Sequence, residues 1–222
     1  MNILVTGSKG DIGSYLMENL DNATALSHQD CDLTDWKQVK KVKWEGQAII
    51  HCACATQYNK GGRIEDDIKM FVNLRRRWPK AKLIAFGSGA MYDRTQEIIK
   101  VSSDYVAYPK DNYSLSKRLT VDLADVTLII FGLEADVRFI KAVKETPNGV
   151  QIYQDTLFSW VKIEDLPKII NWAIKEGKGR YNLCSYDMSL TDMALKYGAT
   201  NIKYLQPGIG LEYTGQNEIS IC

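Results

Sequence analysis

Three glycines directly after the first apolar run constrain the fold more than any other feature of the sequence. Residues 3–6 form an apolar run typical of a buried strand, and Gly7, Gly10 and Gly13 follow it with two residues between each pair. Residues 11–20 then carry apolar side chains at helical spacing. A strand, a glycine loop and a helix in this order are typical of a loop that holds phosphate groups against backbone N–H groups. A purely structural turn is the alternative, because turns also use glycine.

The rest of the first 132 residues continues the alternation of strands and helices. Apolar runs predict strands at residues 23–27, 48–52, 82–87 and 126–131, and amphipathic runs predict helices at 35–42, 64–77 and 113–123. This order predicts an α/β fold of the Rossmann type, with a doubly wound parallel sheet.

The pattern weakens after Gly132. Helices are predicted at 135–144, 166–175 and 189–197, and no element is predicted for the last twenty or so residues. We therefore expect a single domain over residues 1–222. Its dinucleotide-binding core, 1–132, is interleaved with a small C-terminal lobe for the substrate, 133–222.

Charge and cysteine usage exclude several classes of protein. Lys and Arg number 28 against 27 Asp and Glu, a balance that disfavours a dedicated nucleic-acid or membrane-surface binder. There is no apolar run of about 18 residues and no basic signal-peptide region. The five cysteines include no CxxC pair, so neither a disulfide framework nor a zinc site is expected. We expect a cytoplasmic protein with no metal, nucleic-acid or membrane partner.

Tyr113 and Lys117 are a candidate catalytic pair, because a spacing of four places both on one face of the predicted helix. A neighbouring cation favours the phenolate of a tyrosine, whose hydroxyl then exchanges a proton with a hydroxyl or carbonyl oxygen. Ser88 follows the strand at 82–87, at the end where open α/β sheets place their ligands. Its hydroxyl would bond the same oxygen as Tyr113.

These motifs, with the segments 32–35, 51–55 and 86–92, resemble in content and order the extended short-chain dehydrogenase/reductases. The closest likeness is to the NAD-dependent epimerase/dehydratase group, which acts on nucleotide sugars. The resemblance implies that Ser88 and Tyr113 polarise the substrate oxygen and that Lys117 holds the cofactor ribose. It also implies that Asp32 and Leu33 flank the adenine and that Phe131 lies near the nicotinamide. With the loop residues, the expected cofactor site comprises Gly7, Lys9, Gly10, Asp11, Ile12, Gly13, Ser27, His28, Asp32, Leu33, Ala53, Cys54, Ala55, Tyr113, Lys117 and Phe131.

The end of the second predicted strand bears on the choice between NAD(H) and NADP(H). A carboxylate there favours NAD, but this chain has Ser27 and His28, with no acid before Asp30. Ser27, His28 and Lys9 would suit a ribose phosphate, which favours NADP(H) and leaves NAD(H) open. A solvated loop histidine is the alternative for His28.

Several departures from the family narrow the activity. Gly89 and Ala90 stand where dehydratases carry an Asp-Glu pair, which disfavours dehydration, and bifunctional epimerase-reductases carry a cysteine in place of Ala90. Family members often grip the substrate diphosphate with an arginine near Phe158. Here Arg138 is the candidate substrate residue, unless it belongs to a solvated helix face. The stretch after Lys117 is short for the helix on which the family commonly dimerises, so a homodimer stays open.

We therefore expect an NAD(P)-dependent oxidoreductase or epimerase acting at a sugar carbon, C4, of a nucleotide sugar. Tyr113 would be its acid/base. Reduction of a 4-keto group and 4-epimerisation use the same residues, so both remain open. The alternative is a non-catalytic NAD(P)-binding regulatory protein that keeps the fold, which the short C-terminal lobe motivates.

Overall fold

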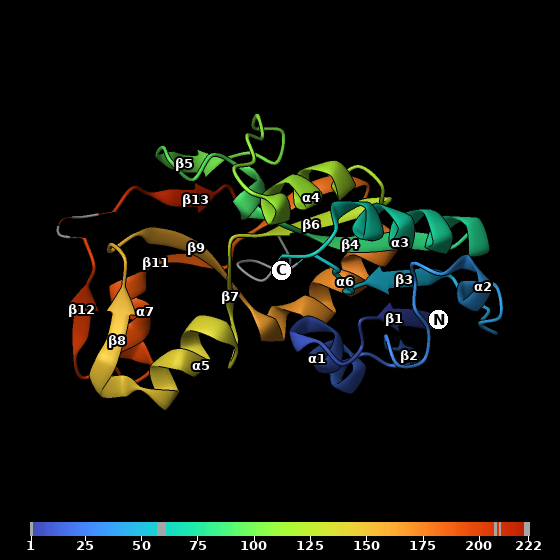
Figure 1. Cartoon of the computed structure of the whole chain (residues 1–222), viewed down its shortest axis with the longest axis horizontal. Coiled ribbons are helices and arrows are strands. Elements are labelled where there is room, and N and C mark those ends of the chain that lie inside the picture. Colours follow the sequence, from blue (N-terminus) through green and yellow to red (C-terminus); the bar gives the residue numbers. More distant parts are fainter. Residues whose placement is uncertain (1, 57–60, 207, 209, 220–222) are drawn as a thin grey trace.

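A parallel sheet forms the centre of the molecule. The computed structural model describes residues 2–56, 61–206, 208 and 210–219. Within them, six parallel strands follow the order β10-β6-β4-β3-β1-β2 (Figure 1). Their bounds are β1 Ile3–Thr6, β2 Ala23–Leu26, β3 Ala48–His51, β4 Lys82–Ser88, β6 Val126–Ile130 and β10 Gly179–Leu183.

Helices cover both faces of this sheet. In Figure 1, α3 (Ile64–Arg77) and α4 (Asn112–Thr120) lie above the sheet, and α1 (Asp11–Asn19) and α6 (Leu166–Lys175) lie below it. Successive side chains of a strand point to opposite faces. Val5 accordingly packs in the cluster of α1 and α6, while Leu4 packs in the cluster of α3. The predicted doubly wound α/β fold is confirmed.

Most of the remaining strands build a second sheet at the other end of the molecule. Its order is β11-β9-β13-β5, and β7 pairs with β9. The bounds are β5 Ile98–Val101, β7 Gly132–Glu134, β9 Leu157–Lys162, β11 Tyr186–Ser189 and β13 Tyr213–Gly215. Two helices, α5 (Arg138–Glu145) and α7 (Leu190–Lys196), and a small sheet of β8 (Val150–Ile152) and β12 (Ile202–Tyr204) complete this lobe. The smaller helical elements are α2 (Trp36–Val39), η1 (Gly89–Met91), η2 (Pro147–Gly149) and η3 (Ile163–Asp165).

The chain crosses between the two sheets more than once. β5 precedes Gly132 in the sequence and yet pairs with β13 of the lobe, whereas β10 lies late in the sequence and pairs with β6 of the central sheet. The candidate site lies between the two sheets, and residues from both line it.

Some predicted helices differ from the observed ones. The helix expected at 135–144 is observed at Arg138–Glu145, and β7, which pairs with β9, ends just before it at Glu134. The helix expected to reach residue 123 ends at Thr120, and the one expected at 35–42 ends at Val39. In the described part of the chain, no helix has both the length and the apolar character needed to cross a membrane.

Candidate functional site

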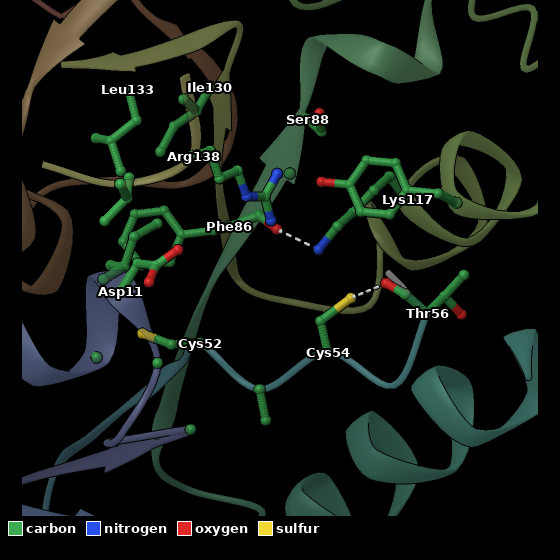
Figure 2. Close-up of a pocket in the computed structure, with 18 of the residues that line it drawn as sticks. Asp11, Cys52, Cys54, Thr56, Phe86, Ser88, Lys117, Ile130, Leu133 and Arg138 are labelled. Atoms are coloured by element: carbon green, nitrogen blue, oxygen red, sulfur yellow. Dashed lines mark hydrogen bonds between the residues drawn. The ribbon is translucent and has the colours of Figure 1, made fainter. Parts of the chain in front are cut away.

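A cleft of about 930 Å³ lies across the C-terminal ends of β1, β3, β4 and β6 and extends to the lobe (Figure 2). Most of the predicted site residues line it: Gly7, Lys9, Gly10, Asp11, Ile12, Gly13, Ser27, His28, Leu33, Ala53, Cys54, Ser88, Tyr113, Lys117, Phe131 and Arg138. Asp32 and Ala55 are not among the lining residues.

The glycine loop leaves room on its cleft side for a phosphate group. Gly7 has a φ of +65°, and a Cβ atom added to it would lie 2.6 Å from the backbone nitrogen of Ala53. A Cβ added to Gly13 would lie 2.2 Å from the Gly7 carbonyl oxygen. At Gly10, the N-cap of α1, a Cβ would meet only that oxygen, at 3.3 Å. Gly7 and Gly13 are therefore required by packing, while the missing side chain of Gly10 keeps the cleft open at a helix N-terminus. This geometry fits a dinucleotide pyrophosphate.

Ser27 is already hydrogen-bonded at the end of β2. Its Oγ and its backbone nitrogen donate to Asp30 Oδ2 at 2.6 and 2.9 Å, and these bonds lower the pKa of Asp30. The Asp30 carboxylate, three residues after Ser27 in the sequence, therefore lies directly against the end of β2. Lys9 donates to Gln29, and the exposed His28 also lines the cleft.

Asp32 and Ala55 support the backbone around the cleft instead of lining it. Asp32 Oδ1 accepts hydrogen bonds from the nitrogen and the hydroxyl of Thr34, at 2.9 and 2.8 Å. Partial burial opposes the charge of Asp32, but these bonds lower its pKa. The Ala55 nitrogen donates to Asp67 Oδ1 at 2.7 Å.

A capping box sets the start of α4 and with it the position of Tyr113. Asp111 Oδ1 accepts from the Ser114 nitrogen at 2.7 Å, and Ser114 Oγ accepts in turn from the Asp111 nitrogen at 3.0 Å. This reciprocal cap places Tyr113 in the first turn and Lys117 one turn later, both on the cleft.

Ser88, Tyr113 and Lys117 come together from β4 and α4. The Lys117 ammonium lies 5.7 Å from the centre of the Tyr113 ring and donates to the Phe86 carbonyl oxygen at 3.3 Å (Figure 2). Ser88 ends β4, and its Oγ accepts from the Ala90 nitrogen at 3.2 Å. The three predicted catalytic side chains therefore share one wall of the cleft.

Lys117 brings a positive charge to this wall. Burial opposes the ammonium of Lys117, but Cys54, Tyr113 and Asp67 around it outweigh burial and raise its pKa. Burial raises the pKa of Cys52 to about 12 and also raises the pKa of Cys54. Lys117 is thus a stable cation, and the two cysteines that line the cleft are neutral thiols. Cys222 lies outside the described residues.

On the lobe side of the cleft, sequence reasoning identified Arg138 and missed the apolar residues. An apolar wall there comes from Leu133, Phe139, Phe158, Trp160 and Leu190, with Lys141 beside it. Leu133 lies in β7, Phe158 and Trp160 lie in β9, and Phe139 and Leu190 lie in α5 and α7. The wall therefore comes from four separate elements, and no single segment indicates it. Sequence reasoning also missed Asp67, whose carboxylate is the last of three acidic residues at the start of α3 and looks like ordinary compensation of the helix dipole.

Solved structures with this fold include several nucleotide-sugar enzymes. A dTDP-4-dehydrorhamnose reductase of Clostridium acetobutylicum is 17% identical, with a TM-score of 0.82 over 98% of this chain and 90% of that one. The Bacillus anthracis dTDP-4-dehydrorhamnose reductase, in complex with NADP, is 18% identical, with a TM-score of 0.80 and the same coverage. The Campylobacter jejuni GDP-mannoheptose C4 reductase, with NADP bound, is 14% identical, with a TM-score of 0.76 over 99% of this chain and 94% of that one.

Sequence comparison gives the family. A search of curated protein sequences gave no match. The model of the NAD dependent epimerase/dehydratase family matches residues 3–126, which is more than half of the 222 residues. The matched segment contains the glycine loop, Ser88, Tyr113 and Lys117. The chain therefore belongs to the NAD dependent epimerase/dehydratase family.

Proposed function

We propose that this chain is an NAD(P)-dependent oxidoreductase that reduces a 4-keto nucleotide sugar, with Tyr113 as the acid. The observation that carries the proposal is the continuity of one cleft, which joins the glycine loop to Ser88, Tyr113 and Lys117. A dinucleotide held at the loop and a carbonyl held at Ser88 would share this space. The solved reductases of similar fold support the same reaction.

The bound nicotinamide supplies the hydride that reduces the carbonyl carbon. Tyr113 gives its hydroxyl proton to the carbonyl oxygen as that oxygen gains negative charge, and Ser88 donates a hydrogen bond to the same oxygen. The positive charge of Lys117 stabilises the phenolate left on Tyr113. An ammonium has three donors, and Lys117 uses one on the Phe86 carbonyl. Cys54 is a second hydrogen-bond partner, so the third donor can hold a ribose hydroxyl.

The lobe side of the cleft suits a nucleotide sugar. Arg138 and Lys141 bring two cations to the wall, where a diphosphate needs them. Phe139, Phe158 and Trp160 give flat apolar surface for a base or a sugar ring. These groups form the substrate side of the proposal.

The residues after Ser88 disfavour dehydration. Gly89 and Ala90 lie in η1 and carry no acid or base, so the cleft has no second proton-transfer group at this position. Reduction and epimerisation need only the Ser88, Tyr113 and Lys117 set.

We also propose NADP(H) as the preferred cofactor, because Lys9 and the exposed His28 line the cleft near the end of β2. The Asp30 carboxylate beside Ser27 works against a phosphate, so the preference is modest. Dissociation constants for NADPH and NADH, measured side by side, should favour NADPH. Lys9→Ala should reduce the difference, and tighter binding of NADH by the native protein would contradict the assignment.

The proposed reaction is tested by turnover of purified protein on a panel of 4-keto nucleotide sugars and their 4-hydroxy counterparts, followed at the nicotinamide absorbance. A reductase oxidises one NAD(P)H for each sugar reduced. Interconversion of two nucleotide sugars without net cofactor oxidation would identify an epimerase instead. Dinucleotide binding without turnover of any of them would contradict both and favour the regulatory protein.

A further inference from the structure

Asp67 is a buried carboxylate that the proposed reaction does not use. It lies near the N-terminal end of α3 and is 3% exposed. Its Oδ1 accepts a hydrogen bond from the Ala55 nitrogen at 2.7 Å. Its Oδ2 accepts from the Thr56 nitrogen at 3.1 Å and from Ser116 Oγ at 2.6 Å. One side chain therefore joins α3, the loop after β3 and α4.

Both of the segments that Asp67 holds carry cleft residues. Ala53 and Cys54 line the cleft immediately before Ala55, and Cys54 Sγ donates to the Thr56 carbonyl oxygen at 2.8 Å (Figure 2). Ser116 directly precedes Lys117 on α4. A carboxylate removed from water is costly unless its hydrogen bonds are satisfied, and here three donors converge on it. Its hydrogen bonds thus hold the loop and α4 against each other, and both segments line the cleft.

The charge of Asp67 also acts on Lys117. The titratable groups that interact with Lys117 in the described structure are His51, Cys52, Cys54, Tyr113 and Asp67. Burial opposes the Lys117 ammonium, and Cys54, Tyr113 and Asp67 raise its pKa against that opposition. Asp67 is the carboxylate of this set, and the cysteines are neutral thiols because burial raises their pKa values.

We propose that Asp67 is a positioning residue of this site, which holds the loop of residues 53–56 against α4 and places a carboxylate in the surroundings of Lys117. This proposal depends on the proposed function only for the role of Lys117 in holding the cofactor. The electrostatic part concerns the protein alone and is measured without any ligand.

The test is a pH titration of the ligand-free protein labelled with ¹³C at the lysine side chains, with the Lys117 signal assigned from Lys117→Met. In the native protein, Lys117 should remain protonated to above pH 10.4 or so, the ordinary value for lysine. Asp67→Asn keeps the size and removes the charge, and it also replaces one accepting oxygen by an NH₂ donor. The Lys117 titration should therefore move to lower pH. Ser116→Ala removes one hydrogen bond and keeps the charge, so its titration should match the native one.

NADPH affinity supplies the second readout. NADPH affinity should fall with rising pH as Lys117 loses its proton. In Asp67→Asn this fall should begin at a lower pH than in the native protein. Ser116→Ala should weaken binding equally at every pH. An Asp67→Asn protein with native Lys117 titration overturns the proposal.

The two hypotheses fail separately. If Asp67→Asn does not fold, the native titration decides, and a Lys117 that titrates clearly below the ordinary lysine value overturns the role of Asp67. A native protein that binds neither NADPH nor NADH contradicts the proposed function, while the lysine titration still decides the electrostatic role.

Discussion

At the scale of single residues, Gly10 separates ligand binding from folding within the glycine loop. Gly10→Val puts a branched side chain at the N-cap beside the cleft, where its Cβ would meet only the Gly7 carbonyl oxygen, at 3.3 Å. Dinucleotide affinity should fall more than about tenfold, or 1.4 kcal/mol, with little change in melting temperature. Gly13→Ala is the matched contrast: its Cβ would lie 2.2 Å from the Gly7 oxygen, and overpacking of this kind costs about 1–3 kcal/mol or more of stability.

Calorimetry with NADPH and thermal denaturation separate these two effects. Native NADPH affinity in Gly10→Val would show that the dinucleotide does not lie along this loop. Native stability in Gly13→Ala would show that the loop packs more loosely than the structure indicates.

Arg138 combines backbone strain with a place on the cleft wall. Its φ of 44° lies in the left-handed region, which costs a non-glycine residue on the order of 1 kcal/mol. Arg138→Gly should therefore be as stable as the native protein or up to about 1 kcal/mol more stable, whereas Arg138→Ala keeps the strain. Both variants lose the guanidinium, so both should raise KM for the nucleotide sugar. Urea denaturation measures the stability of the two variants, and steady-state kinetics measures their KM. An unchanged KM would assign Arg138 to a solvated face.

At the scale of elements, prediction from sequence succeeded for the helices and strands whose hydrophobic pattern lies within one continuous segment. α3 and α6 match the predicted ranges because each is a complete amphipathic run with a clear end. β1, β3, β4 and β6 of the central sheet were predicted because most of their residues are buried, which makes them continuous apolar runs. β10 of the same sheet was not predicted, because polar residues interrupt its sequence. β7 and β11 are short and partly exposed, so only their pairing with β9 defines them.

The candidate site divides in the same way. The glycine loop and the Tyr113–Lys117 pair lie within single segments, and their spacing is visible in the sequence. Asp67 and Trp160 reach the site through tertiary contacts between segments far apart in the chain, and local spacing carries no record of such contacts.

Glu134 joins β7 to the outer part of the lobe. Its carboxylate accepts from the hydroxyls of Tyr186 and Tyr197 at 2.5 and 2.7 Å and pairs with Lys196. Burial opposes this charge, but the three donors lower the pKa of Glu134. Since the folded-state pKa lies below the unfolded value of about 4.3, the carboxylate stabilises the fold above that pH. This contribution is lost as pH falls through the folded-state pKa.

Glu134→Gln should therefore lower the free energy of unfolding by about 1–3 kcal/mol at pH 7. The difference from the native protein should shrink below pH 4 or so, where the native carboxylate becomes protonated. Urea denaturation between pH 7 and pH 3 measures it. A difference that stays constant over that range would show that the charge of Glu134 contributes nothing.

At the scale of the whole molecule, the exchange of strands between the two sheets predicts cooperative unfolding. β5, from the N-terminal part of the sequence, belongs to the sheet of the lobe, and β10, from the C-terminal part, belongs to the central sheet. Neither sheet is therefore complete without residues from both parts of the chain. Trp78 reports on the core and Trp160 on the lobe. Variants that keep only Trp78 or only Trp160 of the five tryptophans should unfold with the same midpoint, and NADPH should raise both midpoints together. A lobe transition that precedes the core transition would contradict this.

The central claim is that the cleft uses Tyr113 to protonate a reduced carbonyl oxygen, and Tyr113→Phe tests it most directly. The substitution removes one hydroxyl, so folding and NADPH affinity should survive. Tyr108→Phe is the matched control, because Tyr108 is 60% exposed and does not line the cleft. Single-turnover hydride transfer at the nicotinamide absorbance should slow by about 10²–10⁴-fold in Tyr113→Phe and stay native in Tyr108→Phe. A native rate in Tyr113→Phe, with native NADPH binding, would contradict the account.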